Sequence, residues 1–290
     1  MTMDTDLAAL VRAAAAGDGD AMRAVVAAVQ DPVYRLALRM LGHPADAEDA
    51  TQEILVIVVT HLGSFRGDSA VNTWVWRIAA RYLARARRGR REVMSFTQLD
   101  GNLRTGLDPT ATASASVEDD PEAQLLSREL RLRCTQAMLL SLDRELRIAY
   151  LLGDIFELSG QDAADVLEIS PAAYRKRLSR ARQLLHAFLR GWCGVFDAAN
   201  PCRCAGQVAC AVERKILDPQ QLELSSHPAS HPASHPASGD ARLSRATDEL
   251  DAMFRVAEVL RGHPAYRAPD ALVARLRTLL DPRRLTLLSH

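Results

Sequence analysis

The chain of 290 residues lacks any apolar run near the roughly 20 residues that a membrane span needs. Its first residues include Asp4 and Asp6 and have no apolar core, so they do not resemble a signal peptide. It also lacks a glycine-rich nucleotide loop, a paired acid–base constellation and a hydrolase motif. These absences predict a cytoplasmic protein that is not an enzyme.

Lysine is almost missing, because all but Lys176 and Lys215 of the 36 basic residues are arginine. Coding preference produces such a bias too, so arginine abundance alone is no evidence of phosphate contacts. The formal net charge is +0, but the charges are segregated along the chain. Acids cluster within 46–53 and 119–122, and bases within 77–91 and 175–190. Local charge, and not the total, therefore indicates function.

The clearest pattern is a series of three helices in the second half of the chain. Apolar residues recur three and four apart from Ile148 to Ile155, which predicts the first helix. Ser159 is a suitable N-cap for a short second helix over 160–167. A turn at Glu168–Ile169 then leads to a third helix, for which Ser170 is the N-cap. Two short helices joined by a tight turn are typical of a helix-turn-helix motif.

The third helix is basic and contains no acid between Ser170 and Arg190. Such a helix fits the major groove of DNA, where its N-terminal residues reach base edges and Arg or Lys bind phosphates. The alternative is a solvated basic face in a helical bundle, but the two caps and the short turn favour DNA binding. The predicted DNA contacts are Ser170, Ala173, Tyr174, Arg175, Lys176, Arg177, Ser179 and Arg180.

Two further helices are predicted in the first half of the chain. Residues 46–61 begin with acids, which suit the positive end of a helix dipole, and they end with an apolar half. These acids are either helix-end charges or a docking face for a basic partner.

The helix from Thr73 combines three aromatic residues with seven arginines before residue 92. Aromatic rings stack on unpaired bases, so this combination suits melted DNA; a core tryptophan among solvated arginines is the alternative. Trp74 and Trp76 lie about 200° apart on a helix, which predicts that one of them is exposed.

Three stretches in this order resemble a bacterial extracytoplasmic-function (ECF) sigma factor of the sigma-70 family over roughly residues 5–190. They are ALRMLGHPADAEDATQEILVIVV, LGSFRGDSAVNTWVWRIAARYLARARR and the helix-turn-helix. The resemblance implies an all-α fold with two sigma domains that bind core RNA polymerase and promoter DNA to begin transcription. A stand-alone helix-turn-helix regulator is the alternative, but it leaves the acidic and aromatic helices unexplained.

The resemblance also implies roles for individual residues. The acidic helix would dock on the clamp coiled coil of the polymerase β′ subunit through Asp46, Glu48, Asp49, Gln52 and Glu53. The next segment would hold the minus-10 element through Phe65, Arg66, Thr73, Trp74, Trp76, Arg77, Arg81, Arg85 and Arg88. The basic helix would read the minus-35 element, and the β flap and an anti-sigma factor are further partners. Arg81 stands where the family often has Asn, and Glu168 where such turns often have glycine.

The resemblance implies sigma domain two (1–93) and sigma domain four (125–190). Composition and periodicity predict a flexible linker (94–124) between them, and after them a Cys-containing segment (191–218), a spacer with HPAS repeats (219–240) and a helical C-terminal extension (241–290). Proline at every fourth position favours polyproline II in the repeats, so their histidines do not share one face. The amphipathic helices of the extension are too small for a core of their own. They should pack on another part of the chain or on a partner.

Four of the five cysteines lie close together, at Cys193, Cys202, Cys204 and Cys210. Nearby thiolates suit zinc or another metal, but no paired CxxC is present, and redox sensing or a reduced, packed turn remain open. A Cys-metal enzyme is disfavoured, because no polar catalytic partners lie near these residues. Cys134 lies on an apolar helical face and is predicted to be core. Since the cluster abuts the basic helix, we predict that the extension regulates the sigma domains in cis.

Overall fold

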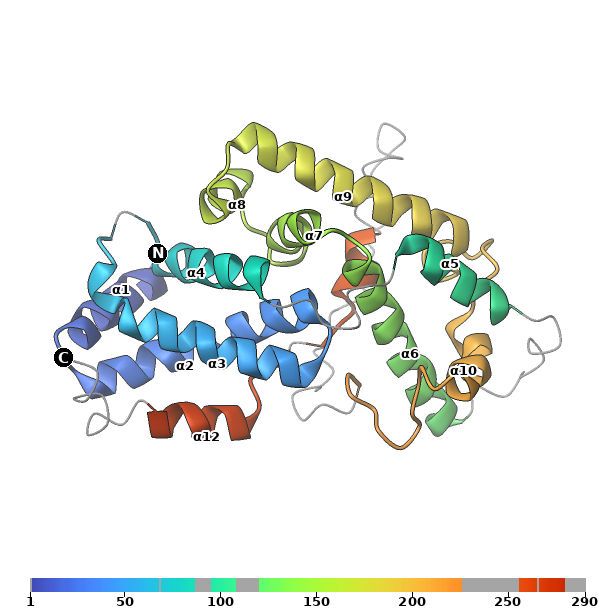
Figure 1. The fold of residues 1–290 in the computed structure, drawn as a ribbon, viewed down its shortest axis with the longest axis horizontal. Coiled ribbons are helices and arrows are strands. Elements are labelled where there is room, and N and C mark those ends of the chain that lie inside the picture. The colour runs from blue at the N-terminus through green and yellow to red at the C-terminus, as the bar shows by residue number, and fades with distance from the viewer. Residues whose placement is uncertain are drawn as a thin grey trace. The chain divides into compact units, whose positions relative to one another are not determined.

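The computed structural model describes residues 2–67, 69–86, 95–107, 120–225, 256–264 and 266–279. Throughout these ranges the regular structure is helical apart from one isolated bridge, as predicted for an all-α fold (Figure 1). The chain forms two compact units. Unit 1 contains residues 1–89, 158–174 and 266–290, and unit 2 contains residues 90–157 and 175–265. No helix in the described part is long and apolar enough to cross a bilayer.

Unit 1 is a helical bundle. Its elements are α1 (Thr2–Ala15), α2 (Gly19–Leu41), α3 (Pro44–Thr60), η1 (Leu62–Ser64), α4 (Val71–Arg85), α8 (Gly160–Leu167) and α12 (Asp270–Leu279). The Asp18 side chain caps α2 by accepting from the N–H of Asp20 at 2.9 Å, and Gly42 ends it with φ 76°. Helices α1 and α3 pack against α2, and α4 packs on α3. The core lies between these helices and includes Val25 and Ile54, each with 0% exposure.

Helix α2 continues through Pro32, a residue type that usually interrupts a helix. A proline inside a helix removes one backbone hydrogen bond and crowds the preceding turn. Val29 and Val33, on either side of it, are 1% and 0% exposed. Burial of this continuous apolar face offsets the cost of the proline. The local breaker signal is therefore overruled by packing.

Unit 2 contains the remaining helices. They are α5 (Phe96–Thr105), α6 (Pro121–Leu140), α7 (Arg144–Tyr150), the π-helical turn η4 (Leu151–Ile155), α9 (Pro171–Trp192, of which residues 171–174 belong to unit 1), α10 (Cys204–Glu213) and a helical turn over 256–261. Helix α6 packs on α10. The buried guanidinium of Arg147 donates to the carbonyls of Leu139, Leu140 and Leu142, each at 2.9 Å. Arg147 thereby satisfies acceptors at the end of α6 that have no partner inside the helix.

Helix α5 lies inside the stretch predicted to be a flexible linker, so that prediction is wrong for residues 96–105. Ser95 caps α5 with a complete capping box: Gln98 N–H donates to Ser95 Oγ at 3.2 Å, and Ser95 N–H donates to Gln98 Oε1 at 2.8 Å. Leu99 is 6% exposed, and Phe96 packs against Phe188 of α9 at 5.5 Å between ring centroids. The capping signal was in the sequence, but the apolar stripe was too short to reveal the helix.

Candidate nucleic-acid interface

The helix-turn-helix forms as predicted. Asp162 N–H donates to Ser159 Oγ at 3.1 Å and begins α8, and Ala173 N–H donates to Ser170 Oγ at 3.2 Å and begins α9. Glu168 ends α8 in the left-handed conformation, with φ 54°. A non-glycine residue costs about 1 kcal/mol there. Ala163 and Ala164 of α8 are fully buried, so their small size permits close packing of α8.

Helix α9 has one buried face and one exposed basic face. Ala181, Leu185 and Leu189 are each 0% exposed and repeat at the helical period. The opposite face begins at the N-terminus of the helix. Its exposed residues are Ser170, Arg175, Lys176, Ser179 and Arg180. Arg175 and Ser179 are four residues apart, as are Lys176 and Arg180, so they form two adjacent rows. This face offers three cations and two hydroxyl groups to a ligand.

Three of the residues predicted to contact the minus-35 element do not belong to this exposed basic face. Tyr174 is 1% exposed, so it belongs to the core and the prediction that it contacts DNA is wrong. Ala173 is only half-buried and lies at the edge of the exposed face. Arg177 pairs with Glu145 at 2.8 Å, so its charge is partly neutralised within unit 2. Periodicity alone did not separate these residues, because tyrosine and arginine occur on either face of a helix.

An aromatic pair begins the second basic surface. The rings of Phe65 and Trp74 lie 5.6 Å apart with an interplanar angle of 60°. Trp74 and Trp76 are both half-buried, so the prediction of one core and one exposed tryptophan is wrong. Arg66 and Arg85 are exposed. The remaining predicted minus-10 residues Thr73 and Arg77 are half-buried, and Arg88 lies outside the described residues.

A hollow of about 450 Å³ lies beside this aromatic pair. Trp74, Ile78 and Tyr82 of α4 supply apolar lining, and Arg81 and Arg85 supply charge. Helix α3 contributes Ile57, and the chain after it contributes His61 and Ser64. An open cavity with ring faces and guanidinium groups has the chemistry that binds an unpaired base and its phosphate.

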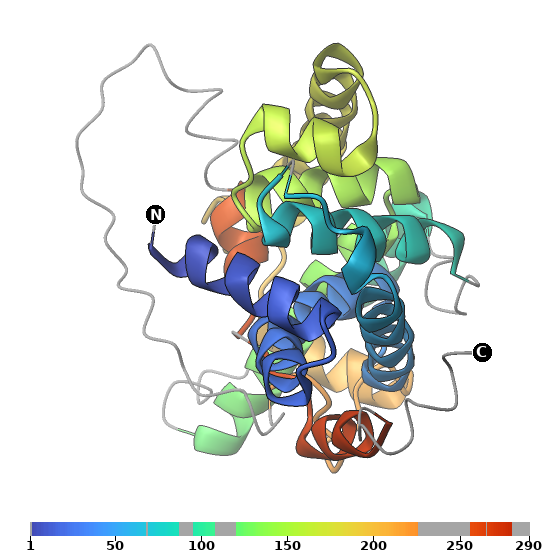
Figure 2. The same cartoon turned by 90° about the vertical axis from the view of Figure 1, so that its left-hand side faces the viewer.

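Arg81 and Glu168 form a two-pronged ion pair within unit 1, where α4 lies beside α8 (Figure 2). Arg81 Nε donates to Glu168 Oε2 at 2.9 Å, and a second guanidinium nitrogen bonds the other carboxylate oxygen. The hydrogen bond from Arg81 lowers the pKa of Glu168, and the positive charges of Arg81 and Arg77 act in the same direction. Arg81 stands where the resembling family often has Asn, and Glu168 stands where helix-turn-helix turns often have glycine. The structure therefore joins two departures that the sequence left separate.

Helix α3 presents an acidic stripe. Asp46, Asp49 and Glu53 are exposed and are spaced three and four residues apart, so they lie on one face. Glu48 and Gln52 are half-buried beside this stripe. Burial raises the pKa of Tyr82 on α4, and the negative charges of Glu53 and Asp49 raise it further. The stripe is thus a real source of negative potential on the surface of unit 1.

The cysteines gather in unit 2. Cys193 and Cys202 pair through a backbone bridge, in which Cys202 N–H donates to the Trp192 carbonyl at 3.2 Å. Cys202, Cys204 and Cys210 line a cavity of about 310 Å³ together with Cys134 of α6, which the sequence placed in the core. Within the described part of the chain, no three His, Cys, Asp or Glu side chains are arranged to hold a metal ion. Metal binding by Cys193, Cys202, Cys204 and Cys210 therefore stays a prediction.

The protonation of these thiols agrees with a packed turn. Burial raises the pKa of Cys202 to about 12, and the neighbouring thiols Cys204 and Cys193 add to the shift. Burial is also the main cause that raises the pKa of Cys204. Thiolate, and not thiol, is the nucleophile and the metal ligand. Burial therefore keeps Cys202 and Cys204 in the thiol form in this arrangement.

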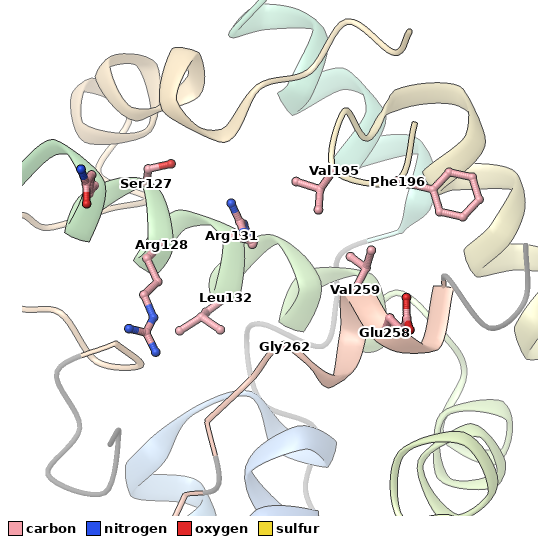
Figure 3. A pocket seen from close by; sticks show the side chains of 10 residues that line it. Ser127, Arg128, Arg131, Leu132, Val195, Phe196, Glu258, Val259 and Gly262 are labelled. Atoms are coloured by element: carbon pink, nitrogen blue, oxygen red, sulfur yellow. The ribbon is translucent and has the colours of Figure 1, made fainter. Parts of the chain in front are cut away.

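The chain after α10 packs on α6, including residues 219–225 of the stretch that the sequence predicts to be a spacer. The carboxylate of Glu129, which is 0% exposed, accepts from the backbone N–H groups of Leu224 at 3.1 Å and Ser225 at 2.6 Å. His263 Nε2 lies 2.7 Å from Thr135 Oγ1, and both residues are buried. Next to these contacts, an open cavity of about 710 Å³ lies between α6 and the 256–262 segment, with Arg131, Phe196 and Glu258 among its lining residues (Figure 3).

Together, these features define an all-helical DNA-binding protein with a helix-turn-helix, a separate aromatic and basic surface and an acidic stripe on α3. The chain matches the family described as Sigma-70 region 2 over residues 25–93 and the one described as Sigma-70, region 4 over residues 132–185. It is 30% identical to the ECF RNA polymerase sigma factor SigW of Bacillus subtilis over 177 residues, which are 60% of this chain and 91% of the relative. It is 31% identical to the RNA polymerase sigma-H factor of Pseudomonas aeruginosa over 184 residues, which are 62% of this chain and 92% of the relative.

The chain belongs to the ECF sigma factors of the sigma-70 family. It is a sigma factor that binds core RNA polymerase and directs transcription initiation at promoter DNA. This family consists of transcription initiation factors and not of enzymes. Neither family match extends beyond residue 185, so the cysteine segment and the extension lie outside both.

Proposed function

We propose that the exposed basic face of α9 reads the minus-35 element. The single observation that carries this assignment is that Arg175, Lys176 and Arg180 project from the N-terminal half of a helix-turn-helix recognition helix, on a face without acids. N-terminal residues of such helices reach base edges in the major groove. Ser170 and Ser179 add hydroxyl groups that suit phosphate contacts.

The minus-10 element is proposed to bind at the hollow beside Phe65 and Trp74. Its aromatic and guanidinium lining supports stacking on one extruded base, with Arg66 and Arg85 exposed to follow the backbone. Arg81 is partly occupied by Glu168, so its contact to DNA would require that ion pair to open.

The acidic stripe of α3 is proposed to dock on the clamp coiled coil of the β′ subunit. Asp46, Asp49 and Glu53 are exposed and share one face, which supports a polar contact to a basic helix. Unit 2 is proposed to approach the β flap. We infer further that the protein does no catalysis of its own, acts in the cytoplasm and is regulated through its extension or by an anti-sigma factor.

Run-off transcription with purified core polymerase tests this assignment. The chain should direct initiation from a promoter that it selects, and the charge-reversed variant Asp49→Lys/Glu53→Lys should lose co-purification with core polymerase while keeping its helical content. A stand-alone regulator would instead bind DNA without supporting initiation. Co-purification that survives both reversals would show that these acids are only helix-end charges.

A further inference from the structure

Helix α12 belongs to unit 1 and contacts α3 (Figure 1). Leu272 and Leu276, one helical turn apart, are 0% and 1% exposed. Tyr266, just before the helix, is also 1% exposed. A hollow of about 410 Å³ remains between α12 and α2, lined by Val273 and Leu276 on one side and by residues from Arg23 to Gln30 on the other.

One polar contact lies before this apolar seam and a second lies along its flank. Before α12, the N–H of Ala268 donates to Asp31 Oδ1 of α2 at 2.9 Å. On α12 itself, Arg275 Nη2 lies 3.3 Å from Glu48 Oε2 of α3. The Glu48 side chain is 25% exposed and the Arg275 side chain 49% exposed, so the pair lies at the border of the seam. A seam with a leucine pair, one hydrogen bond and one ion pair defines both position and direction of the bound helix.

The ion pair connects α12 to the acidic stripe of α3. Glu48 belongs to the same helix as the exposed acids Asp46, Asp49 and Glu53, and it is the member that already has a cationic partner. On an α-helix Glu48 lies about 100° around the axis from Asp49, so a partner broad enough to cover both the stripe and Glu48 overlaps α12. The surface is therefore occupied in cis by a helix that combines leucines with arginine, which is the chemistry of an amphipathic basic ligand.

We propose that the α2–α3 surface bordered by Glu48 is a docking site for a basic amphipathic helix, that α12 is its intramolecular occupant, and that α12 and core polymerase exclude one another there. This proposal rests on the proposed docking of the acidic stripe on polymerase. Covalent attachment gives α12 an effective concentration on the order of millimolar, so weak contacts suffice to keep it bound. A partner that binds the stripe more tightly displaces it by competition.

The test measures the affinity of full-length variants for core polymerase. In Leu272→Ser/Leu276→Ser the apolar stripe is lost, so α12 should detach and polymerase should bind about tenfold more tightly. Arg275→Glu should act in the same direction but by a smaller factor, because an exposed ion pair contributes little. Arg267→Glu makes the same charge change at an exposed residue outside α12 and should leave the affinity unchanged. Hydrogen exchange of α12 reports detachment independently.

A peptide of residues 266–279, added to Leu272→Ser/Leu276→Ser, should rebind and restore the weaker polymerase affinity. Loss of α12 protection without any change in polymerase affinity would overturn the exclusion. If no form of the chain binds polymerase, the proposed docking of the stripe fails instead. The docking site is then judged by the peptide: binding that Glu48→Gln weakens supports the site, and absence of binding overturns it.

Discussion

Tyr174 illustrates at the residue scale how burial assigns a role. It lies on the recognition helix between Ala173 and Arg175, yet it is 1% exposed, and Gly160 of α8 lies against its ring. A side chain in this position anchors α9 in the helix-turn-helix and does not reach a base. The same helix turn thus contains one core residue and one exposed cation side by side.

We predict that Tyr174→Ala lowers the free energy of unfolding by about 3–5 kcal/mol, because a large buried aromatic side chain is lost and a cavity remains. Tyr174→Phe keeps the ring and should leave minus-35 affinity unchanged. Urea denaturation and fluorescence anisotropy on a minus-35 duplex measure the two effects. A folded Tyr174→Phe variant that no longer binds the duplex would return Tyr174 to the DNA-contacting set.

The Arg81–Glu168 pair makes a second prediction at this scale. Hydrogen bonding from Arg81 holds the pKa of Glu168 below its ordinary value, so in Arg81→Gln that pKa should rise towards the ordinary value. Because the folded pKa is lowered, the pair stabilises the α4–α8 contact above the ordinary pKa of Glu, and this contribution is lost as pH falls through the folded value. Carbon-detected NMR titration of the Glu168 carboxyl measures this pKa in both proteins. An unchanged pKa in Arg81→Gln would mean that the pair does not persist in solution.

At the scale of the element, α9 serves two purposes along opposite faces. Its buried residues Ala181, Leu185 and Leu189 join it to the protein, and its exposed cations remain free of that packing. Arg177 and Arg182 lie between the two faces and pair with Glu145 and Asp154, the latter at 2.8 Å from Arg182 Nε. Two arginines of the helix therefore form ion pairs within the protein.

Replacing Arg175, Lys176 and Arg180 together by alanine should weaken minus-35 binding strongly. Each phosphate contact removed should also reduce the slope of log affinity against log salt by about 0.9, because fewer counterions are released. Arg190→Ala changes the charge at the other end of the same helix and is the matched control. Anisotropy over a salt series gives both quantities. Equal salt slopes for the triple variant and the parent chain would sink the assignment of this face.

At the scale of the whole molecule, the chain after α10 contributes to both compact units. Residues 217–225 and 256–264 pack within unit 2, and α12 packs within unit 1. In unit 2 the buried Glu129 carboxylate accepts backbone N–H groups from the 223–225 segment and pairs with Arg133 at 2.8 Å. Such an acceptor is costly to leave unpaired, so this segment and α6 depend on each other.

Glu129→Ala removes that acceptor and should release residues 217–225 from α6. Backbone N–H groups in 223–225 should then exchange faster with solvent, while protection of α2 and α3 in unit 1 stays unchanged. Hydrogen exchange by mass spectrometry measures both regions in one experiment. Glu122→Ala, at an exposed position on the same helix, is the control and should leave exchange of 223–225 as it is. Unaltered exchange in Glu129→Ala would show that the segment is held by its apolar residues alone.

The sequence by itself determined the helix-turn-helix and much of the interface, although it did not reveal α5. Apolar periodicity, the caps Ser159 and Ser170 and the acid-free run after Ser170 are local properties, so they predicted the helix-turn-helix and its basic face. Charge segregation likewise predicted the acidic stripe of α3. These features depend on neighbours within one or two helical turns, which a single sequence displays directly.

Only the tertiary structure decided which side chains are available and which distant residues meet. Tyr174 is buried in the core, and Arg81 forms an ion pair with Glu168. Cys134 lines the same cavity as cysteines of the 193–210 segment, and Arg275 forms an ion pair with Glu48. Each of these outcomes depends on contacts between residues far apart in sequence, except the burial of Tyr174, which depends on the face that α9 turns inwards. The local sequence pattern does not specify such long-range pairings. A charged or aromatic residue can lie on the buried or the exposed face of a helix, and the residues packed against that helix decide which.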